Sequence, residues 1–166
     1  MRIFSVILAL AVTFLVISCS KTNDTCNFGD SSKVAPKTEQ DNLLDSITKY
    51  NIDANLAPQG YYYSITNPGT GAIVSNLCNT ISVKYWGGFF DGRGFDSSSS
   101  PINLVLGQTI LGWQKAIPLV KEGGDINIYI PPSLAYGSDV VTDRSGNVLI
   151  PANSYLVFKV HVESIR

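Results

Sequence analysis

The sequence predicts an α+β domain built on an antiparallel sheet of five or six strands that curls around one short helix. Three observations support this fold class. Apolar side chains recur at every second position in several segments beyond residue 60, which is the period of a strand with one buried face. Turn residues such as Gly, Pro and Asn separate these segments. One stretch between the strands has the pattern of a helix that could cover the sheet.

Residues 1–18 are expected to be an export signal. Met1 and Arg2 precede an apolar run that ends at Ile17, which is shorter than the roughly 20 residues of a membrane-spanning helix. The end of the signal resembles the lipobox of bacterial lipoproteins, Val16-Ile17-Ser18-Cys19. We therefore expect Cys19 to carry the lipid and to tether the mature chain to a membrane. The alternative is ordinary cleavage, which would leave Cys19 as a chance thiol.

Residues 19–37 are mostly polar, and we expect a flexible tether because they cannot repay the entropy of ordering. Residues 38–56 are expected to form a helical extension with Thr38 as N-cap and Asp41 in the capping-box position. The apolar side chains of this helix share one stripe, formed by Leu43, Leu44, Ile47 and Tyr50. That stripe must dock either on the main domain or on a second copy of the chain, which would make a homodimer.

Residues 57–166 contain the predicted sheet. A short strand is expected to begin at Phe95, after a hairpin turn at Asp91-Gly92. The other strands are expected over 61–66, 81–86, 102–106, 126–130 and 156–162. The covering helix is expected over 110–117, where Pro118 ends it because the residue before a proline avoids the helical region.

The composition excludes several classes of function. The chain has 12 Lys and Arg against 13 Asp and Glu and no basic block, so we expect no nucleic-acid partner. One His and three Cys disfavour a hydrolase triad and a clustered metal site. His161 has the outward phase of its strand and is expected to face water, and Gly87-Gly88 indicates a bulge. We expect no metal and no cofactor, which leaves an apolar pocket with a few polar groups.

Cys26 and Cys78 remain as thiols once the signal and Cys19 are set aside. In an exported protein, where the surroundings are oxidising, a disulfide between them is a natural expectation. It would join the start of the mature chain to the main domain. The alternative is that Cys26 lies free in the tether and Cys78 is simply buried.

Six short motifs of the main domain occur in an order that is informative as a set. They are Tyr85-x-Gly87, Asp91-Gly92-x-x-Phe95-Asp96-Ser97-Ser98, Leu106-Gly107-Gln108, Ile110-x-Gly112-Trp113, Ala135-Tyr136-Gly137 and Ile150-Pro151-x-x-x-x-Leu156-Val157-Phe158. No single motif is specific. Their order and approximate spacing resemble those of FKBP-type peptidyl-prolyl cis-trans isomerases, over roughly residues 60–166.

The resemblance implies a half-barrel of antiparallel strands wrapped on the short helix, with the proline ring of a substrate held between them. It implies a pocket with an aromatic floor and walls, formed by Trp113, Tyr85, Phe95 and Phe158. It implies a hydrogen bond to the substrate from the Ile110 N–H, a second from the Tyr136 hydroxyl, and a carboxylate at the pocket edge from Asp96.

The same resemblance assigns apolar lining to Leu104 and Ile110. This chain departs from the family pattern at the rim, where Ile102 replaces a residue that is usually aromatic and Thr109 one that is usually branched and apolar. The loop over 138–149 is also longer than in the smallest members of the family. These departures bear on substrate preference and on affinity for macrolide inhibitors.

The sequence thus predicts an isomerase without a cofactor that acts on proline-containing polypeptide clients. Its expected location is the bacterial cell envelope, lipid-anchored and facing the periplasm or the surface, with the outer membrane favoured. Two alternatives stay open: a non-catalytic chaperone or binding module that uses the same groove, and a surface lipoprotein that acts in adhesion.

Overall fold

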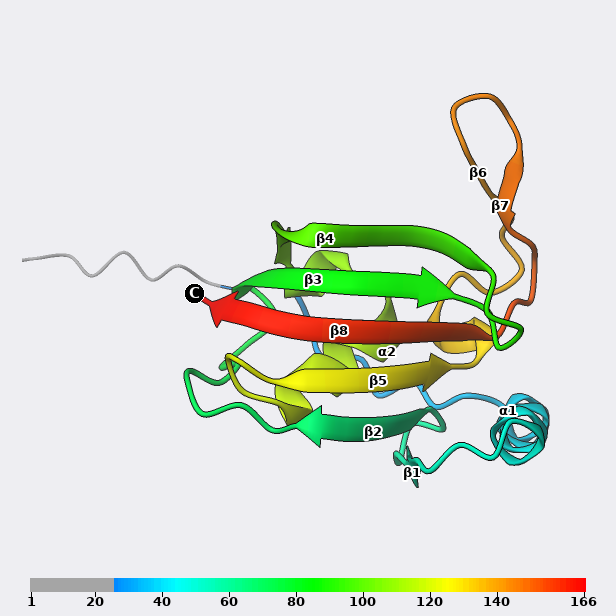
Figure 1. The fold of residues 1–166 in the computed structure, drawn as a ribbon, viewed down its shortest axis with the longest axis horizontal. Coiled ribbons are helices and arrows are strands. Elements are labelled where there is room, and N and C mark those ends of the chain that lie inside the picture. Colours follow the sequence, from blue (N-terminus) through cyan, green and yellow to red (C-terminus); the bar gives the residue numbers. More distant parts are fainter. Residues whose placement is uncertain (1–25) are drawn as a thin grey trace, which may run out of the picture.

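The computed structural model describes residues 26–166. Its main element is a six-stranded antiparallel sheet with the strand order β1-β2-β5-β8-β3-β4 (Figure 1). The strands are β1 (Asn55–Leu56), β2 (Tyr62–Asn67), β3 (Thr80–Gly88), β4 (Gly94–Val105), β5 (Asp125–Ile130) and β8 (Leu156–Ile165). The last strand therefore lies inside the sheet, between β5 and β3. This architecture confirms the predicted α+β class.

One face of the sheet is covered by the short helix α2 (Leu111–Ala116), which lies behind the strands in Figure 1. Trp113 and Ala116 from α2 join the buried side chains of the strands, such as Ile128 and Val160, in one apolar core. The α-helix ends at Ala116, before Pro118, as the sequence predicted. One 3-10 turn, η2 (Ile117–Leu119), follows α2, because a proline in the first turn of a new helix needs no amide hydrogen bond.

The β3–β4 hairpin differs from its prediction in one respect. β4 is a single long strand, whereas the sequence predicted two shorter ones. Its pairing with β3 shifts between Ile102 and Ser98, so that residues 99–101 lie opposite Lys84 alone. A bulge of this kind accommodates Pro101, which has no amide hydrogen to donate, without ending the strand. A second shift falls at Gly87 and Gly88, where the sequence indicated a bulge.

The N-terminal helix α1 (Lys37–Lys49) starts one residue earlier than predicted. Pro36 occupies the N-cap position and no side chain caps the helix, so the predicted Thr38 cap is wrong. The Asp41 side chain forms an ion pair with Lys37 instead of closing a capping box. The helix also ends well before residue 56, because Asn51 adopts a positive φ of 49° and the chain continues into β1.

α1 docks on the face of the sheet opposite α2. Leu43 and Ile47 are buried in a second apolar cluster with Tyr62, Tyr129 and Val157. The other two residues of the predicted stripe, Leu44 and Tyr50, are exposed. The chain's own sheet is thus the surface that α1 covers.

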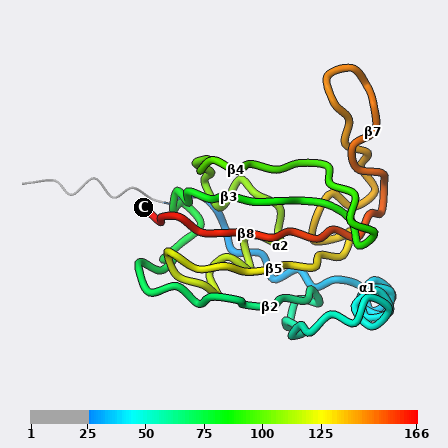
Figure 2. The backbone as a smooth tube through the Cα atoms, in the orientation of Figure 1, coloured from blue at the N-terminus to red at the C-terminus, as the bar shows by residue number. Residues whose placement is uncertain are grey.

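Residues 26–36, here called the N-terminal strap, are held against the domain at several points, which corrects the predicted tether for this part of residues 19–37. Figure 2 shows the strap running behind the sheet, from near the C-terminus to α1. Cys26 forms a disulfide with Cys78, with the two Cα atoms 5.6 Å apart. The Phe28 ring covers Gly107, where an added Cβ would lie 2.3 Å from the ring. Ala35 is buried, and its N–H donates to the Gln59 carbonyl at 2.9 Å.

The tether prediction failed for residues 26–36 because a few contacts outweigh a polar composition. A disulfide, one aromatic ring and an ion pair between Asp30 and Lys115 hold a segment that is otherwise hydrophilic. The predicted signal over 1–18 and the lipidation site at Cys19 lie outside the described residues. Within residues 26–166, no helix has the length and apolarity needed to cross a membrane.

The segment over 138–149 contains a hairpin that the sequence did not predict. β6 (Val141–Thr142) pairs with β7 (Val148–Ile150), and the hairpin projects away from the sheet (Figure 1). Its turn is closed by Asp143, whose side chain accepts hydrogen bonds from the backbone N–H groups of Ser145 and Asn147 at 2.8 and 2.9 Å. An aspartate that satisfies nearby amides in this way stabilises a tight turn.

Candidate active site

A cavity of about 490 Å³ lies between α2, the neighbouring strands and the loop that follows β5. Its lining combines aromatic and aliphatic side chains with a few polar ones: Tyr85, Asp96, Leu104, Gln108, Thr109, Ile110, Leu111, Trp113, Gln114, Ala135, Tyr136 and Phe158. Eight of the ten residues predicted for the pocket are in this set. A cavity of this size and composition suits a small apolar group with polar flanks.

Three aromatic rings form the base of the cavity. Trp113 on α2 is only 4% exposed, and Phe158 on β8 stands against it edge to face, with the ring centres 5.4 Å apart. Tyr85 on β3 makes a similar contact with Trp113 at 5.5 Å. Edge-to-face packing of this kind favours fixed ring positions. The base is therefore a rigid apolar surface formed by three separate elements.

Two predicted residues, Phe95 and Ile102, are not part of the lining. Phe95 packs behind Phe158 at 5.7 Å and against Phe89 at 5.4 Å. Gly87 makes this packing possible, because an added Cβ would lie 2.7 Å from the Phe158 ring and 3.0 Å from that of Phe95. Ile102 is half-buried on β4 at the edge of the core. Phe95 thus contacts the cavity wall through the Phe158 ring.

The polar groups at the mouth are two phenols and one carboxylate. The Tyr85 hydroxyl donates to Asp96 Oδ2 at 2.5 Å. Burial, followed by this hydrogen bond to Asp96, raises the pKa of Tyr85 above its ordinary value. Burial and then the Asp96 charge raise the pKa of Tyr136 as well. Both phenols therefore keep their protons at neutral pH and can act as hydrogen-bond donors.

The segment before α2 presents a backbone amide to the cavity. Ile110 is the N-cap of α2 in an extended conformation, and its N–H makes no hydrogen bond with any other described residue. The carbonyl of Thr109 accepts a hydrogen bond from Gln114 Nε2 at 2.7 Å, which holds the segment in place. The Thr109 hydroxyl donates to the Leu106 carbonyl at 2.7 Å. The Thr109 hydroxyl, which was expected to make the rim more polar, therefore has a hydrogen-bond partner within the chain.

Four lining residues were not predicted from the sequence: Gln108, Leu111, Gln114 and Ala135. Ala135 adjoins Tyr136 in a motif that the sequence analysis singled out, so proximity to Tyr136 was an available signal. Gln114 has a weaker signal, since it follows Ile110 by one helical turn. Its role depends on a side-chain hydrogen bond that the folded chain creates.

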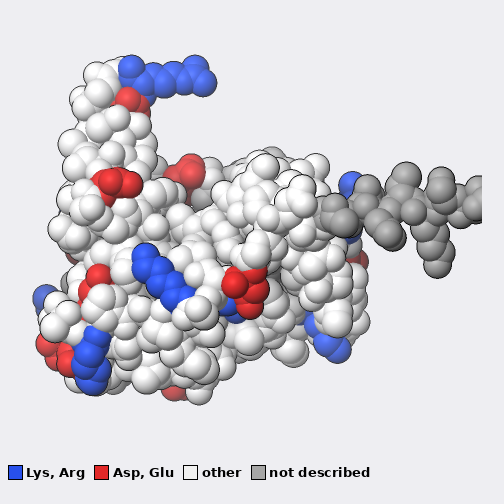
Figure 3. Space-filling model, turned by 180° about the vertical axis from the view of Figure 1, so that it is seen from behind, with Lys and Arg blue, Asp and Glu red and all other residues white. Residues whose placement is uncertain are grey.

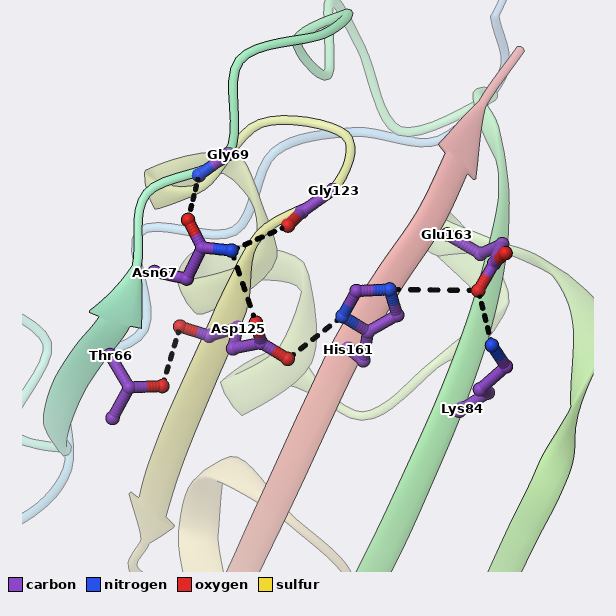
Figure 4. A network of polar contacts seen from close by, with 8 residues as sticks. All are labelled: Thr66, Asn67, Gly69, Lys84, Gly123, Asp125, His161 and Glu163. Atoms are coloured by element: carbon purple, nitrogen blue, oxygen red, sulfur yellow. Dashed lines mark hydrogen bonds and ion pairs between the residues drawn. The ribbon is translucent and has the colours of Figure 1, made fainter.

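His161 lies away from the cavity, on the other face of the sheet. It is half-buried rather than fully turned to water, because its Nδ1 lies 2.8 Å from Asp125 Oδ1 (Figure 4). Its Nε2 lies 3.5 Å from Glu163 Oε2, which is also bound by Lys84. The prediction that His161 faces water holds only in part, since carboxylates on both sides shield it. Within residues 26–166, no group of three or more His, Cys, Asp or Glu side chains is arranged to hold a metal.

Charged side chains are sparse on the face of the molecule shown in Figure 3. Lys and Arg lie interspersed with Asp and Glu among uncharged residues. That face therefore offers no basic surface for a phosphate backbone.

Comparison with known proteins decides the family. A family model described as FKBP-type peptidyl-prolyl cis-trans isomerase matches residues 74–163. The chain belongs to this family. The match runs from just before β3 almost to the end of β8, so it contains every residue that lines the cavity. The strap and α1 lie outside it.

Individual relatives agree with this assignment. The chain is 33% identical to the FKBP-type peptidyl-prolyl cis-trans isomerase FkpA of Buchnera aphidicola over 149 residues, which is 84% of this chain and 57% of that protein. It is 35% identical to the outer membrane protein MIP of Legionella longbeachae, over 67% of this chain and 46% of that protein. The crystal structure of FkpA from Escherichia coli superimposes with a TM-score of 0.61 and 28% identity, over 78% of this chain and 63% of that one. The chain spans about half the length of the curated relatives it matches.

Proposed function

We propose that this FKBP-type chain is an active peptidyl-prolyl cis-trans isomerase that accelerates rotation about X-Pro bonds in exported polypeptides. The observation that carries the proposal is the aromatic base of Tyr85, Trp113 and Phe158. Near it lie two donors, the Ile110 N–H and the Tyr136 hydroxyl, that have no hydrogen-bond partner among residues 26–166. This arrangement suits a proline ring in the cavity and peptide carbonyls at its mouth.

The reaction needs no bond cleavage, only rotation across a barrier of about 18 to 20 kcal/mol that arises from amide resonance. A planar amide is more polar than a twisted one, so water stabilises the planar ground state more strongly. Transfer of the X-Pro bond from water to the apolar cavity removes part of that preference. The twisted amide is then bound better than the planar one, which lowers the barrier.

Two donors are proposed to hold the flanking carbonyls while the bond rotates. One is the Ile110 N–H, which has no internal acceptor among the described residues, and the other is the Tyr136 hydroxyl. Asp96 is proposed to fix Tyr85 through their 2.5 Å hydrogen bond, and Phe95 to support Phe158. A thousandfold acceleration would need only about 4 kcal/mol, which desolvation and two hydrogen bonds can supply.

We further propose that Cys19 is lipidated and anchors the enzyme in the bacterial envelope, with the outer membrane favoured. Because the disulfide joins Cys26 to the main domain, the length of chain between Cys19 and Cys26 limits the distance from the lipid to the domain. Six residues lie between Cys19 and Cys26, so an extended chain places their Cα atoms at most about 25 Å apart. The pocket would then act close to the membrane surface, on proline-containing clients that are being exported.

The chaperone alternative has lost its two supports. The Thr109 hydroxyl is satisfied within the chain, and the apolar residues Leu43 and Ile47 are buried in the sheet. A homodimer through α1 would have to use the exposed residues Leu44 and Tyr50. Sedimentation of the parent and of a Leu44→Ser, Tyr50→Ser variant tests whether such a homodimer forms.

Refolding of a protein whose slow phase is a proline isomerisation separates an isomerase from a simple binder. The proposed enzyme accelerates the slow phase in proportion to its concentration and at amounts far below that of the refolding protein. A chaperone without isomerase activity would reduce aggregation but leave the rate of the slow phase unchanged, and that result would reject the proposal.

A further inference from the structure

The loop that carries Tyr136 begins with a tight turn whose first amide lacks an internal partner. The turn is η3 (Pro132–Leu134), directly after β5 and Pro131. The N–H groups of Ala135 and Gly137 both donate to the Pro132 carbonyl, at 2.9 and 2.8 Å. The two prolines have no N–H, so Ser133 provides the first amide of the turn, and that amide finds no acceptor within it.

Glu39 of α1 supplies the missing acceptor. Its Oε2 lies 2.9 Å from the Ser133 nitrogen, although 94 residues separate the two in the sequence. Glu39 is half-buried at this contact. A hydrogen bond from an amide to an ionised carboxylate is stronger than one between neutral groups. The Ser133 hydroxyl is buried with no partner among residues 26–166, so loss of Glu39 would leave two polar groups of this residue unpaired.

α1 also reaches the other side of the same loop. Asn42 Nδ2 donates to the Tyr155 hydroxyl at 3.2 Å. Two residues before Tyr155, the Asn153 N–H donates to the carbonyl of Gly137 at 2.7 Å. The helix itself is held on the sheet by Leu43 and Ile47. An anchored element therefore touches both the segment that leads into Tyr136 and the segment that returns from the hairpin.

We propose that Glu39 is a positioning residue for the isomerase, and that α1 holds the Tyr136 hydroxyl at the mouth of the cavity through the Ser133 amide. This inference rests on the proposed function and extends it to a helix that lies outside the family match. Without the Glu39 carboxylate, the turn keeps its backbone hydrogen bonds but loses its fixed attachment. Tyr136 then samples positions from which it cannot reach the substrate carbonyl.

The test compares three variants of the full chain. Glu39→Ala removes the acceptor, Glu39→Gln keeps an oxygen that can accept from the Ser133 N–H, and Asp41→Ala removes an ion pair of the same helix that does not touch the loop. We expect kcat/KM on an X-Pro peptide to fall about fivefold to tenfold in Glu39→Ala and to stay within about twofold of the parent in the other two. A fall in Glu39→Gln equal to that in Glu39→Ala, or no fall in either, would overturn the proposal.

A double-mutant cycle distinguishes positioning from a general loss of structure. If Glu39 acts through Tyr136, adding Glu39→Ala to Tyr136→Phe lowers kcat/KM no further than Tyr136→Phe does alone. Losses that multiply in the double variant would show that Glu39 acts elsewhere.

Amide hydrogen exchange tests the attachment without reference to activity. Exchange at Ser133, Ala135 and Gly137 should be faster in Glu39→Ala than in the parent, and unchanged in Asp41→Ala. Unchanged exchange in Glu39→Ala would refute the attachment of the turn by Glu39, even in an active enzyme. An inactive parent with the predicted exchange would reject the proposed function but support the attachment of the turn by Glu39.

Discussion

At the scale of single residues, the Ile110 amide gives the sharpest test of the proposed hydrogen bonding. Ile110 has a φ of −64°, and Thr109 before it is extended, so a proline fits this position without strain. We expect Ile110→Pro to fold but to lower kcat/KM about tenfold, because the substrate carbonyl loses one donor. Ile110→Val, which keeps the amide and an apolar side chain, is the control. Equal activity in the two variants would mean that this amide does not contact the substrate.

Residues of the site differ in how far the sequence revealed them. Trp113, Tyr85 and Phe158 were predictable because they belong to motifs whose order is informative. Phe95 was assigned to the lining from the same motifs, yet Gly87 lets its ring pack behind Phe158. Glu39 gave no signal, since its partner is a backbone amide that is 94 residues away and has no side-chain pattern of its own.

At the scale of elements, α1 should stabilise the domain through one side of the helix only. Leu43 is fully buried against the sheet, whereas the adjacent Leu44 is 45% exposed. We expect Leu43→Ala to lower the free energy of unfolding by about 3 kcal/mol, and Leu44→Ala to change it by less than about 0.5 kcal/mol. Urea unfolding of both variants provides the measurement. Similar values for the two would contradict the observed docking of α1.

The strap makes a second element-scale prediction through its disulfide. Cys26 and Cys78 are 52 residues apart, and closing a loop of that length removes about 4 kcal/mol of chain entropy from the unfolded state. A Cys26→Ser, Cys78→Ser variant should therefore be less stable than the oxidised parent by about 2 to 4 kcal/mol. Reduction of the parent should give the same loss in urea unfolding. Equal stability of the reduced and oxidised parent would show that the disulfide contributes nothing to stability.

The elements that the sequence missed share a physical cause. The strap, the β6–β7 hairpin and the continuous course of β4 each depend on contacts between distant residues or on a local turn closed by a side chain. Period-two patterns found the other strands because burial on one face repeats along the chain. Composition alone indicated a tether where Phe28 and the disulfide impose order.

At the scale of the whole molecule, activity should be insensitive to pH near neutrality. The pKa values of Tyr85 and Tyr136 are raised above 10.0 by burial, so both phenols stay protonated across that range. The only histidine lies on the far face of the sheet. We expect kcat/KM to be constant within about twofold from about pH 6 to about pH 9. A bell-shaped profile in that range would indicate a titrating group that the proposed mechanism does not contain.

Another buried phenol, that of Tyr61, sets the direction of a stability change in alkali. Burial raises the pKa of Tyr61 to about 12, whereas unfolded tyrosine releases its proton near 10. Between these values the folded state binds more protons than the unfolded state, so the free energy of unfolding falls as the pH rises. Below about pH 10 this contribution is fully present.

The central claim is that the cavity of the whole folded chain turns prolyl bonds without a cofactor. The most direct measurement is the cis-trans exchange rate of a short X-Pro peptide by NMR, with purified protein at increasing concentrations and no added metal. The account predicts a rate that rises linearly with protein concentration and that falls markedly for Ile110→Pro. A rate equal to that of the peptide in buffer alone, at every concentration of correctly folded protein, would contradict it.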